Sequence, residues 1–258
     1  MKRVGIVALN TFREAVRDRV LYNLVFFALL MMAAAVVVGQ ISIGIEEIVI
    51  ASLGLSAISI MGLLIAVFLG VALVSKEMDK RTLYALLAKP VRRWEFLLGK
   101  FGGLALTLAV NTAAMALGLL LVMLYMKHAL DRSDVVVLVA VYFIWLKLAL
   151  IVALALMFSC FTTPLLAILF TAGLYIVGLY VQELRNLPME VMSPGMALFT
   201  KWLSYLLPNF ENYNVMAMAV HGRAVPGPLI LQNTLYTVVY CAIVLTAAAA
   251  VFSRKNLK

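Results

Sequence analysis

The sequence predicts an all-α polytopic membrane protein, and its composition and its apolar runs both predict this fold class. Hydrophobic residues make up 65% of the 258 residues and charged residues only 13%, whereas soluble domains contain about 45–50% and about 25%. A soluble fold is excluded because its surface has to be largely polar. The apolar runs are also too long for the strands of a membrane barrel, which have about 10 residues and alternate in polarity.

Six apolar runs are long enough to be transmembrane helices. A helix needs about 20 apolar residues to cross a hydrocarbon core about 30 Å thick. Lys147 is the only formal charge within the six runs. We therefore expect one transmembrane domain over residues 1–258, with spans at Val20–Val38, Ile48–Val74, Phe101–Met126, Val135–Phe158, Pro164–Val181 and Leu229–Phe252.

Residues 1–19, before the first span, predict an interfacial helix. Ile6, Leu9, Phe12 and Val16 recur at helical spacing, so they share one apolar face. A basic amphipathic helix of this kind suits the boundary between anionic headgroups and acyl chains of membrane lipid. The alternative is that the same apolar face caps the helix bundle.

Lysine and arginine are concentrated on one side of the predicted spans. The N-terminal segment, the loop after the second span and the C-terminal tail hold 15 of the 21 basic residues. The positive-inside rule assigns that side to the cytoplasm. We therefore expect a multi-pass protein of the cell (inner) membrane with both termini cytoplasmic. The net charge of +9 then marks orientation, and we expect no nucleic-acid partner.

The loop at residues 75–100 is the longest cytoplasmic connection and the most highly charged. A short helix over Lys76–Ala88 would end before Pro90, because proline disfavours helical backbone in the residue before it. One interpretation is a solvated basic loop. The apolar face that this helix would carry favours the other interpretation, a surface that contacts a partner.

The outer segment at residues 183–228 differs from the other loops in its proline content. It holds five of the seven prolines, so no long helix is expected to cross it. Between them, Gly195–Leu207 is apolar but only 13 residues long. This length is too short to span a bilayer and predicts a re-entrant or interfacial helix.

Polar side chains form stripes on three of the predicted spans, and the stripe in the sixth consists of Asn233, Tyr236, Thr237 and Tyr240. Ser52, Ser56 and Ser59 in the second span are spaced i, i+4, i+7, and Thr171 and Tyr175 in the fifth are spaced i, i+4. Each set therefore lies on one face of its helix. Hydroxyls that join packed helices are one interpretation. The lining of a substrate path is the other.

Lys147 lies 12 residues into the fourth span, which places it about 18 Å along the helix and near the middle of the membrane. A charged side chain at this depth is costly, so it should find a pairing group or water. No acid lies within any predicted span to pair with it. A structural role and a role in transport both fit.

The chain carries no pattern for catalysis, for a cofactor or for a metal. It has no G-x-x-x-x-G-K-[ST] motif, so we do not expect it to bind ATP itself. Cys160 and Cys241 lie at or within spans and are expected to be free thiols. His128 and His221 are far apart in sequence. We predict that the chain is not an enzyme.

Two sequence blocks carry a resemblance to a known family. From Glu77 to Lys100 the chain reads E-x₃-R-T-L-x₂-L-L-x₂-P-x₂-R-x₂-F-x₂-G-K, and the outer segment contains the block Leu207–Asn214. With its N-terminal helix, six spans and re-entrant outer segment, the chain resembles the permease subunits of ABC-type exporters. It is particularly similar to the group that contains the permease for nitrous oxide reductase maturation.

This resemblance implies an ATP-driven exporter in which a separate ABC ATPase subunit binds Mg-ATP. It also implies a homodimer of permeases, with the path lined by spans two and five. The loop would hold a coupling helix that docks on the ATPase through charged and apolar side chains. The residues implied in this coupling are Glu77, Arg81, Leu83, Leu86, Leu87, Pro90 and Arg93.

Two other functions stay open from the residues alone. One is an ATP-independent transporter or channel that uses Lys147 and the polar stripes. The other is a membrane scaffold of a maturation complex. Purified chain that moves substrate without nucleotide would favour the first, and a partner without ATP-linked flux would favour the second.

Overall fold

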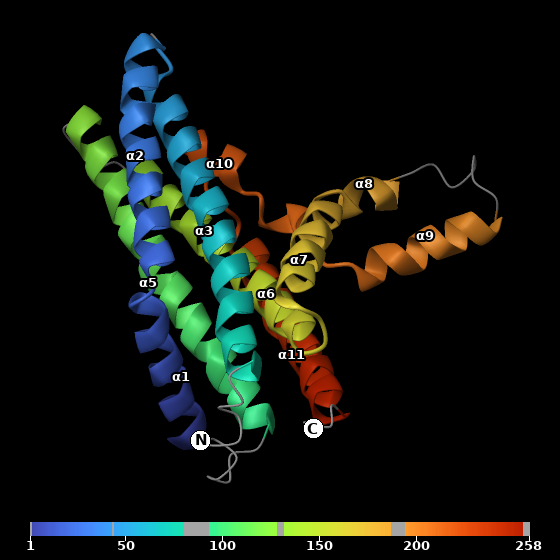
Figure 1. Ribbon diagram of the computed structural model, residues 1–258. Helices are drawn as coiled ribbons and strands as arrows, with labels where there is room; N and C mark the ends of the chain where they lie inside the picture. Colours follow the sequence, from blue (N-terminus) through green and yellow to red (C-terminus); the bar gives the residue numbers. More distant parts are fainter. Residues whose placement is uncertain (1, 43, 80–92, 128–131, 187–193, 255–258) are drawn as a thin grey trace.

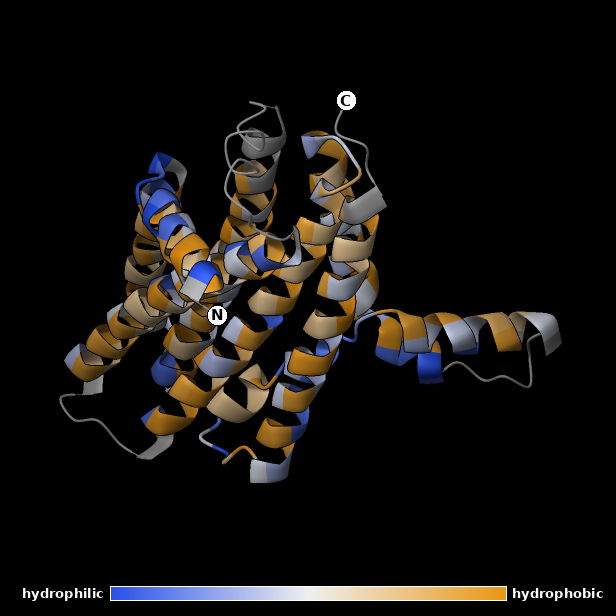
Figure 2. Ribbon diagram, turned by 90° about the horizontal axis from the view of Figure 1, so that it is seen from below, coloured by the Kyte–Doolittle hydropathy of each residue, from blue (hydrophilic) through white to orange (hydrophobic). Residues whose placement is uncertain are grey.

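The computed structural model describes residues 2–42, 44–79, 93–127, 132–186 and 194–254, and every element in these ranges is a helix. Long helices stand side by side in a bundle, with both termini near the same end (Figure 1). Most residues of these helices are hydrophobic (Figure 2), and many large apolar side chains are exposed, as expected for contact with lipid. The polytopic α-helical fold class is confirmed.

Five helices in the described ranges are long and apolar enough to cross a membrane. They correspond to five of the six predicted spans, and α6 lies at the centre, where it contacts α3, α5, α7, α10 and α11. Most of the long side chains in its second half are fully buried. The five are α2 (Arg19–Ile41), α3 (Glu46–Asp79), α5 (Arg93–Lys127), α6 (Arg132–Ser159) and α11 (Gly227–Arg254).

The fifth predicted span is shorter than predicted. It forms α7 (Pro164–Leu179), which has 16 residues and is about 24 Å long, less than the thickness of a hydrocarbon core. The helix ends where another part of the chain crosses it. The backbone N–H of Phe210 donates to the carbonyl of Gly178 at 3.0 Å, which satisfies one of the carbonyls that a helix end leaves free.

The N-terminal helix α1 (Lys2–Val16) packs along the first half of α5. A Cβ atom on Gly103 of α5 would lie 2.5 Å from the carbonyl oxygen of Ala8, so glycine permits this close approach. Lys100 and Glu14 form an ion pair at 3.7 Å. The side chain of Ile6 is 61% exposed on the surface away from α5. The helix thus packs on α5 through Val7, Ala8 and Thr11, whereas Ile6 and Leu9 of the predicted apolar face are exposed. Its interfacial role stays a prediction.

The outer segment forms two short paired helices, α8 (Val181–Asn186) and α9 (Pro194–Leu206). They project sideways from the bundle (Figure 1). The guanidinium of Arg185 donates to the carbonyl of Ser204 at 2.8 Å and joins them. The chain then returns through the 3₁₀ helix η2 (Glu211–Tyr213) and α10 (Met216–Val220), both of which pack on α6.

Candidate functional site

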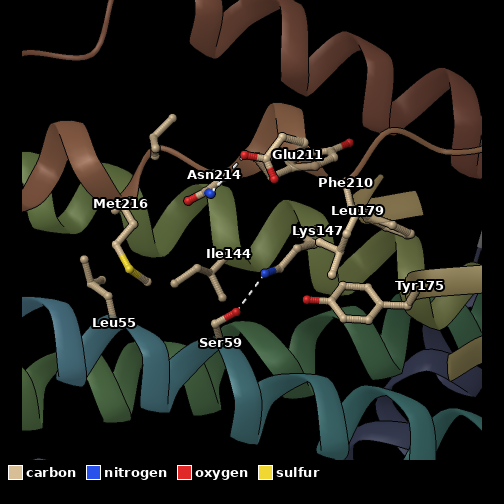
Figure 3. A pocket seen from close by; sticks show the side chains of 13 residues that line it. Leu55, Ser59, Ile144, Lys147, Tyr175, Leu179, Phe210, Glu211, Asn214 and Met216 are labelled. Atoms are coloured by element: carbon tan, nitrogen blue, oxygen red, sulfur yellow. Dashed lines mark hydrogen bonds between the residues drawn. The ribbon is translucent and has the colours of Figure 1, made fainter. Parts of the chain in front are cut away.

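A cavity of about 240 Å³ lies where α3, α6 and α7 meet the returning η2 segment (Figure 3). Each helix presents one face to it, because its lining residues recur at intervals of three or four. Its lining residues are Leu55 and Ser59 of α3; Ala140, Ile144 and Lys147 of α6; Tyr175 and Leu179 of α7; and Phe210, Glu211, Tyr213, Asn214, Val215 and Met216 of the returning segment.

Lys147 extends from α6 into this cavity toward α3 (Figure 3). Its Nζ donates a hydrogen bond to the Oγ of Ser59 at 2.7 Å, and it lies 5.8 Å from the centre of the Tyr175 ring. A face of tyrosine attracts a cation at this distance. An ammonium has three donors, and Ser59 accepts one. Lys147 makes no ion pair with any residue in the described ranges.

Glu211 and Asn214 form the polar, exposed side of the cavity. The Nδ2 of Asn214 donates to Oε1 of Glu211 at 3.1 Å. The backbone N–H of Glu211 donates to Oδ1 of Asn209, also at 3.1 Å. These two bonds fix the turn that carries the carboxylate. Lys147 and Glu211 both line this cavity, Lys147 from α6 and Glu211 from η2.

Aromatic side chains hold the returning segment against the bundle. The hydroxyls of Tyr213 and Thr237 share a hydrogen bond at 2.7 Å, and the hydroxyl of Tyr236 accepts from the N–H of Asn209 at 3.1 Å. The ring of Phe210 lies 5.3 Å from that of Tyr175. Burial raises the pKa of the Tyr213 phenol, because burial disfavours the charged form. The phenol thus stays neutral where η2 contacts α11.

The structure brings together some of the predicted path residues and separates others. Ser59, Lys147 and Tyr175 line the cavity together. The hydroxyl of Ser56 lies one turn away and contacts the Sδ of Met216 at 3.8 Å. Thr171 is fully buried and donates to the carbonyl of Ala167 in its own helix at 2.7 Å. Ser52 is half-buried and does not line the cavity. A role of these residues in transport stays a prediction.

The comparison with protein families decides what class of membrane protein this is. The sequence model of the ABC-2 family transporter proteins matches residues 6–257. The chain belongs to the ABC-2 transporter family. No curated protein matches the chain. ABC-2 permeases are membrane components that are not themselves ATPases, and the family implies an ABC ATPase partner. The resemblance to ABC permeases is confirmed, while the likeness to the nitrous oxide reductase maturation group stays a prediction.

The coupling residues predicted for this ABC-2 permease fall mostly outside the described ranges. Glu77 lies in the last turns of α3 and Arg93 begins α5. These two helix ends lie at the end of the bundle that holds both chain termini (Figure 1). Their coupling role stays a prediction, as does that of the residues outside the described ranges, which are Arg81, Leu83, Leu86, Leu87 and Pro90.

Sequence reasoning missed part of the ABC-2 permease cavity. Glu211 and Asn214 belong to the block that carried the family resemblance, but they were assigned to an outer loop. Three amides and a carboxylate within residues 209–214 are dense polarity for such an apolar chain, and this was the available signal. Phe210 and Met216 gave none, because an aromatic or a methionine is ordinary in an apolar chain.

Proposed function

We propose that this chain is the permease subunit of an ATP-driven ABC exporter, in which a separate ATPase subunit binds Mg-ATP. The observation that carries the proposal is the family match over residues 6–257. Transport needs a polar region within the membrane, and the cavity that holds Lys147 provides one. Export as the direction of transport is part of the proposal.

The connection between α3 and α5 is proposed as the dock for the ATPase. Glu77, Arg81 and Arg93 would position it by charge, and Leu83, Leu86 and Leu87 would fill a groove on the partner, with Pro90 ending the coupling helix. Complementary charges at an interface favour one register of binding. The ends of α3 and α5 lie beside both termini (Figure 1), which supports this proposal. We assign that end of the bundle to the cytoplasmic side of the inner membrane.

The substrate path is proposed to lie beside α3 and α7, which are the predicted second and fifth spans, in a homodimer of permeases. The cavity between these helices supports this. A neighbouring surface of α7 carries exposed apolar residues, among them Leu165, Leu169 and Ile176. This surface is available to a second copy or to lipid.

The test of coupling reverses two charges in the proposed dock. The permease is co-expressed with a candidate ABC ATPase partner, purified and reconstituted in liposomes. Glu77→Lys combined with Arg81→Glu is expected to lower complex yield and permease-stimulated ATPase activity about tenfold, because charge pairs at the dock become repulsive. The readouts are co-purification and phosphate release.

A matched control reverses the same pair of charges on the opposite side of the membrane. Glu183→Lys with Arg223→Glu changes two exposed outer residues and is expected to leave both readouts unchanged. Normal assembly and ATPase activity in the dock variant would show that coupling does not use this loop.

A second candidate, an ATP-independent transporter, is favoured by one observation. Lys147, Ser59 and Tyr175 form a polar cavity within a single chain, so a complete site does not require a second subunit. This candidate predicts that the purified chain alone moves substrate across liposomes without nucleotide. The exporter predicts flux only with the ATPase and ATP.

A further inference from the structure

The cavity between α3, α6 and the returning segment has opposite charges on two of its walls. Lys147 extends from α6, and Glu211 lies on η2 at the exposed mouth (Figure 3). The two charged groups form no direct ion pair, although both line the same space. Most other lining side chains are apolar, including Leu55, Ile144 and Leu179. The charges are thus separated by a space that a ligand can occupy.

The surroundings of Lys147 leave hydrogen-bonding capacity for a ligand. Its one hydrogen-bond acceptor in the described ranges is the neutral hydroxyl of Ser59, at 2.7 Å. Two donors of the ammonium are then free to bind another acceptor. A charge in a membrane helix is costly and normally marks a functional site. A ligand with a negative group would supply the missing compensation.

The position of Glu211 determines what kind of negative group can reach this lysine. A simple anion would have to pass a carboxylate at the mouth, which repels it, and a simple cation would be repelled by Lys147 in the interior. A group that carries both a negative and a positive charge can interact favourably with Lys147 and with Glu211. The carboxylate is held in place by Asn214 at 3.1 Å and by the turn at Asn209.

The volume limits the size of that group. A cavity of about 240 Å³ is smaller than the 300–1,000 Å³ typical of sites for drug-sized ligands. It holds roughly eight waters at about 30 Å³ each. This space fits a group of the size of an amino acid or of a phospholipid headgroup.

We propose that this cavity binds a small zwitterionic group, with its negative end on Lys147 and Ser59 and its positive end at Glu211. The inference rests on the proposed permease function, because it names the class of substrate that the path would take. The shared chemistry comes from two sources, either a small free zwitterion or the headgroup of a zwitterionic lipid.

The test is equilibrium binding to the purified full-length chain in detergent, without ATPase or nucleotide. O-phosphoethanolamine is the zwitterionic probe, and inorganic phosphate and ethanolamine each carry one of its two charged groups. Calorimetric titration is expected to show the zwitterion binding at least about tenfold more tightly than either, since each lost charge contact costs about that factor or more.

Variants at both walls test whether the cavity is the site. Lys147→Met and Glu211→Gln are each expected to weaken phosphoethanolamine binding at least about tenfold. Lys147→Arg keeps the positive charge and is expected to retain most of the binding, which also shows that the site survives substitution. Lys201→Met and Glu183→Gln make matched changes at exposed positions on α9 and α8 and are expected to have no effect.

A lipid arm distinguishes the two sources. The chain is placed in nanodiscs that contain equal phosphatidylethanolamine and phosphatidylglycerol, and native mass spectrometry measures which lipid it retains. Retention of phosphatidylethanolamine that depends on Lys147 and Glu211 assigns the site to a lipid headgroup. Binding of free phosphoethanolamine without such retention assigns it to a small solute.

Three results would overturn the proposal. They are equal binding of inorganic phosphate and phosphoethanolamine, unchanged binding in Glu211→Gln, and no binding of either the free probe or the lipid. None of them bears on coupling, because the ATPase is absent from the assay. Conversely, a result that disproves docking of the ATPase on the permease would not change the outcome of this binding measurement.

Discussion

Gly178 lets two distant parts of the chain meet beside the cavity. A Cβ atom at this position would lie 2.4 Å from the Phe210 ring and 2.7 Å from the carbonyl oxygen of Pro208. Both distances are shorter than van der Waals contact. The close approach also brings the N–H of Phe210 to the carbonyl of Gly178. The absence of a side chain at Gly178 therefore allows the end of α7 to pack closely against the segment that leads into η2.

Substitution of this glycine is expected to destabilise the protein and to open the cavity. Gly178→Ala should lower the free energy of unfolding by about 1–3 kcal/mol, because overpacking forces the backbone of residues 208–210 to move. The measurement is thermal or denaturant unfolding in detergent. Gly173→Ala in the same helix is the control, since no atom lies within 4 Å of its added Cβ. Equal stability of the two variants would contradict the packing described here.

The contact between α1 and α5 has the same physical basis at the scale of whole elements. Gly99 and Gly103 are four residues apart on one face of α5, and an added Cβ on Gly99 would lie 2.6 Å from Val7. Small residues at this spacing let two helix backbones approach closely. The ion pair between Lys100 and Glu14 lies at the same contact.

A bulkier residue in this contact is expected to release α1 from the bundle. Gly103→Val should displace α1, because its Cβ would lie 2.5 Å from the carbonyl oxygen of Ala8. Limited proteolysis after Arg13 is expected to become about tenfold faster, as cleavage follows the population of the open form. Gly5→Val is the control, because a Cβ added at this position of α1 meets nothing within 4 Å outside its own helix. Unchanged proteolysis of the Gly103 variant would show that this contact does not hold α1.

Hydropathy predicted the positions of the long helices but not all of their ends. The helix α3 continues to Asp79, beyond the predicted end of its span at Val74, and α5 begins at Arg93, before Phe101. An apolar run marks the part of a helix that lies in lipid, whereas the backbone hydrogen bonds continue into the charged residues beyond it. The opposite error occurred in α7, where a tertiary contact at Gly178 ends the helix.

The charge distribution makes a prediction for the whole molecule. Both termini lie near the same end of the bundle (Figure 1), and the positive-inside rule places that end in the cytoplasm. A membrane-impermeant maleimide applied to intact cells is expected to label Arg223→Cys. It should label Arg13→Cys only after the membrane is permeabilised.

The native thiols give this experiment a low background. Cys160 and Cys241 are both buried, with exposed fractions of 0% and 5%. The unsubstituted chain is the matched control and is expected to stay unlabelled. Labelling of Arg13→Cys from outside would reverse the orientation assigned to the molecule.

The candidate site shows how far a sequence alone can predict a tertiary arrangement in a membrane. Ser59, Lys147 and Tyr175 stood out because each is polar in an apolar run, and all three line one cavity. Glu211 was not placed there, since its position depends on the path of the chain after α9. That path is set by contacts such as the one between Asn209 and Tyr236, which no periodicity reveals.

The length of α3 has a mechanical consequence. Its 34 residues run without a break from Glu46 to Asp79, so the segment from Ser59 to Asp79 is one continuous helical lever about 30 Å long. A tilt of about 5° of that lever moves one end relative to the other by about 2–3 Å, given the helical rise. A displacement of this size between Ser59 and Lys147 would lengthen the hydrogen bond of 2.7 Å that joins them beyond the range of a hydrogen bond. If α3 tilts as one body, we expect movement at its Asp79 end to change the contact between Ser59 and Lys147.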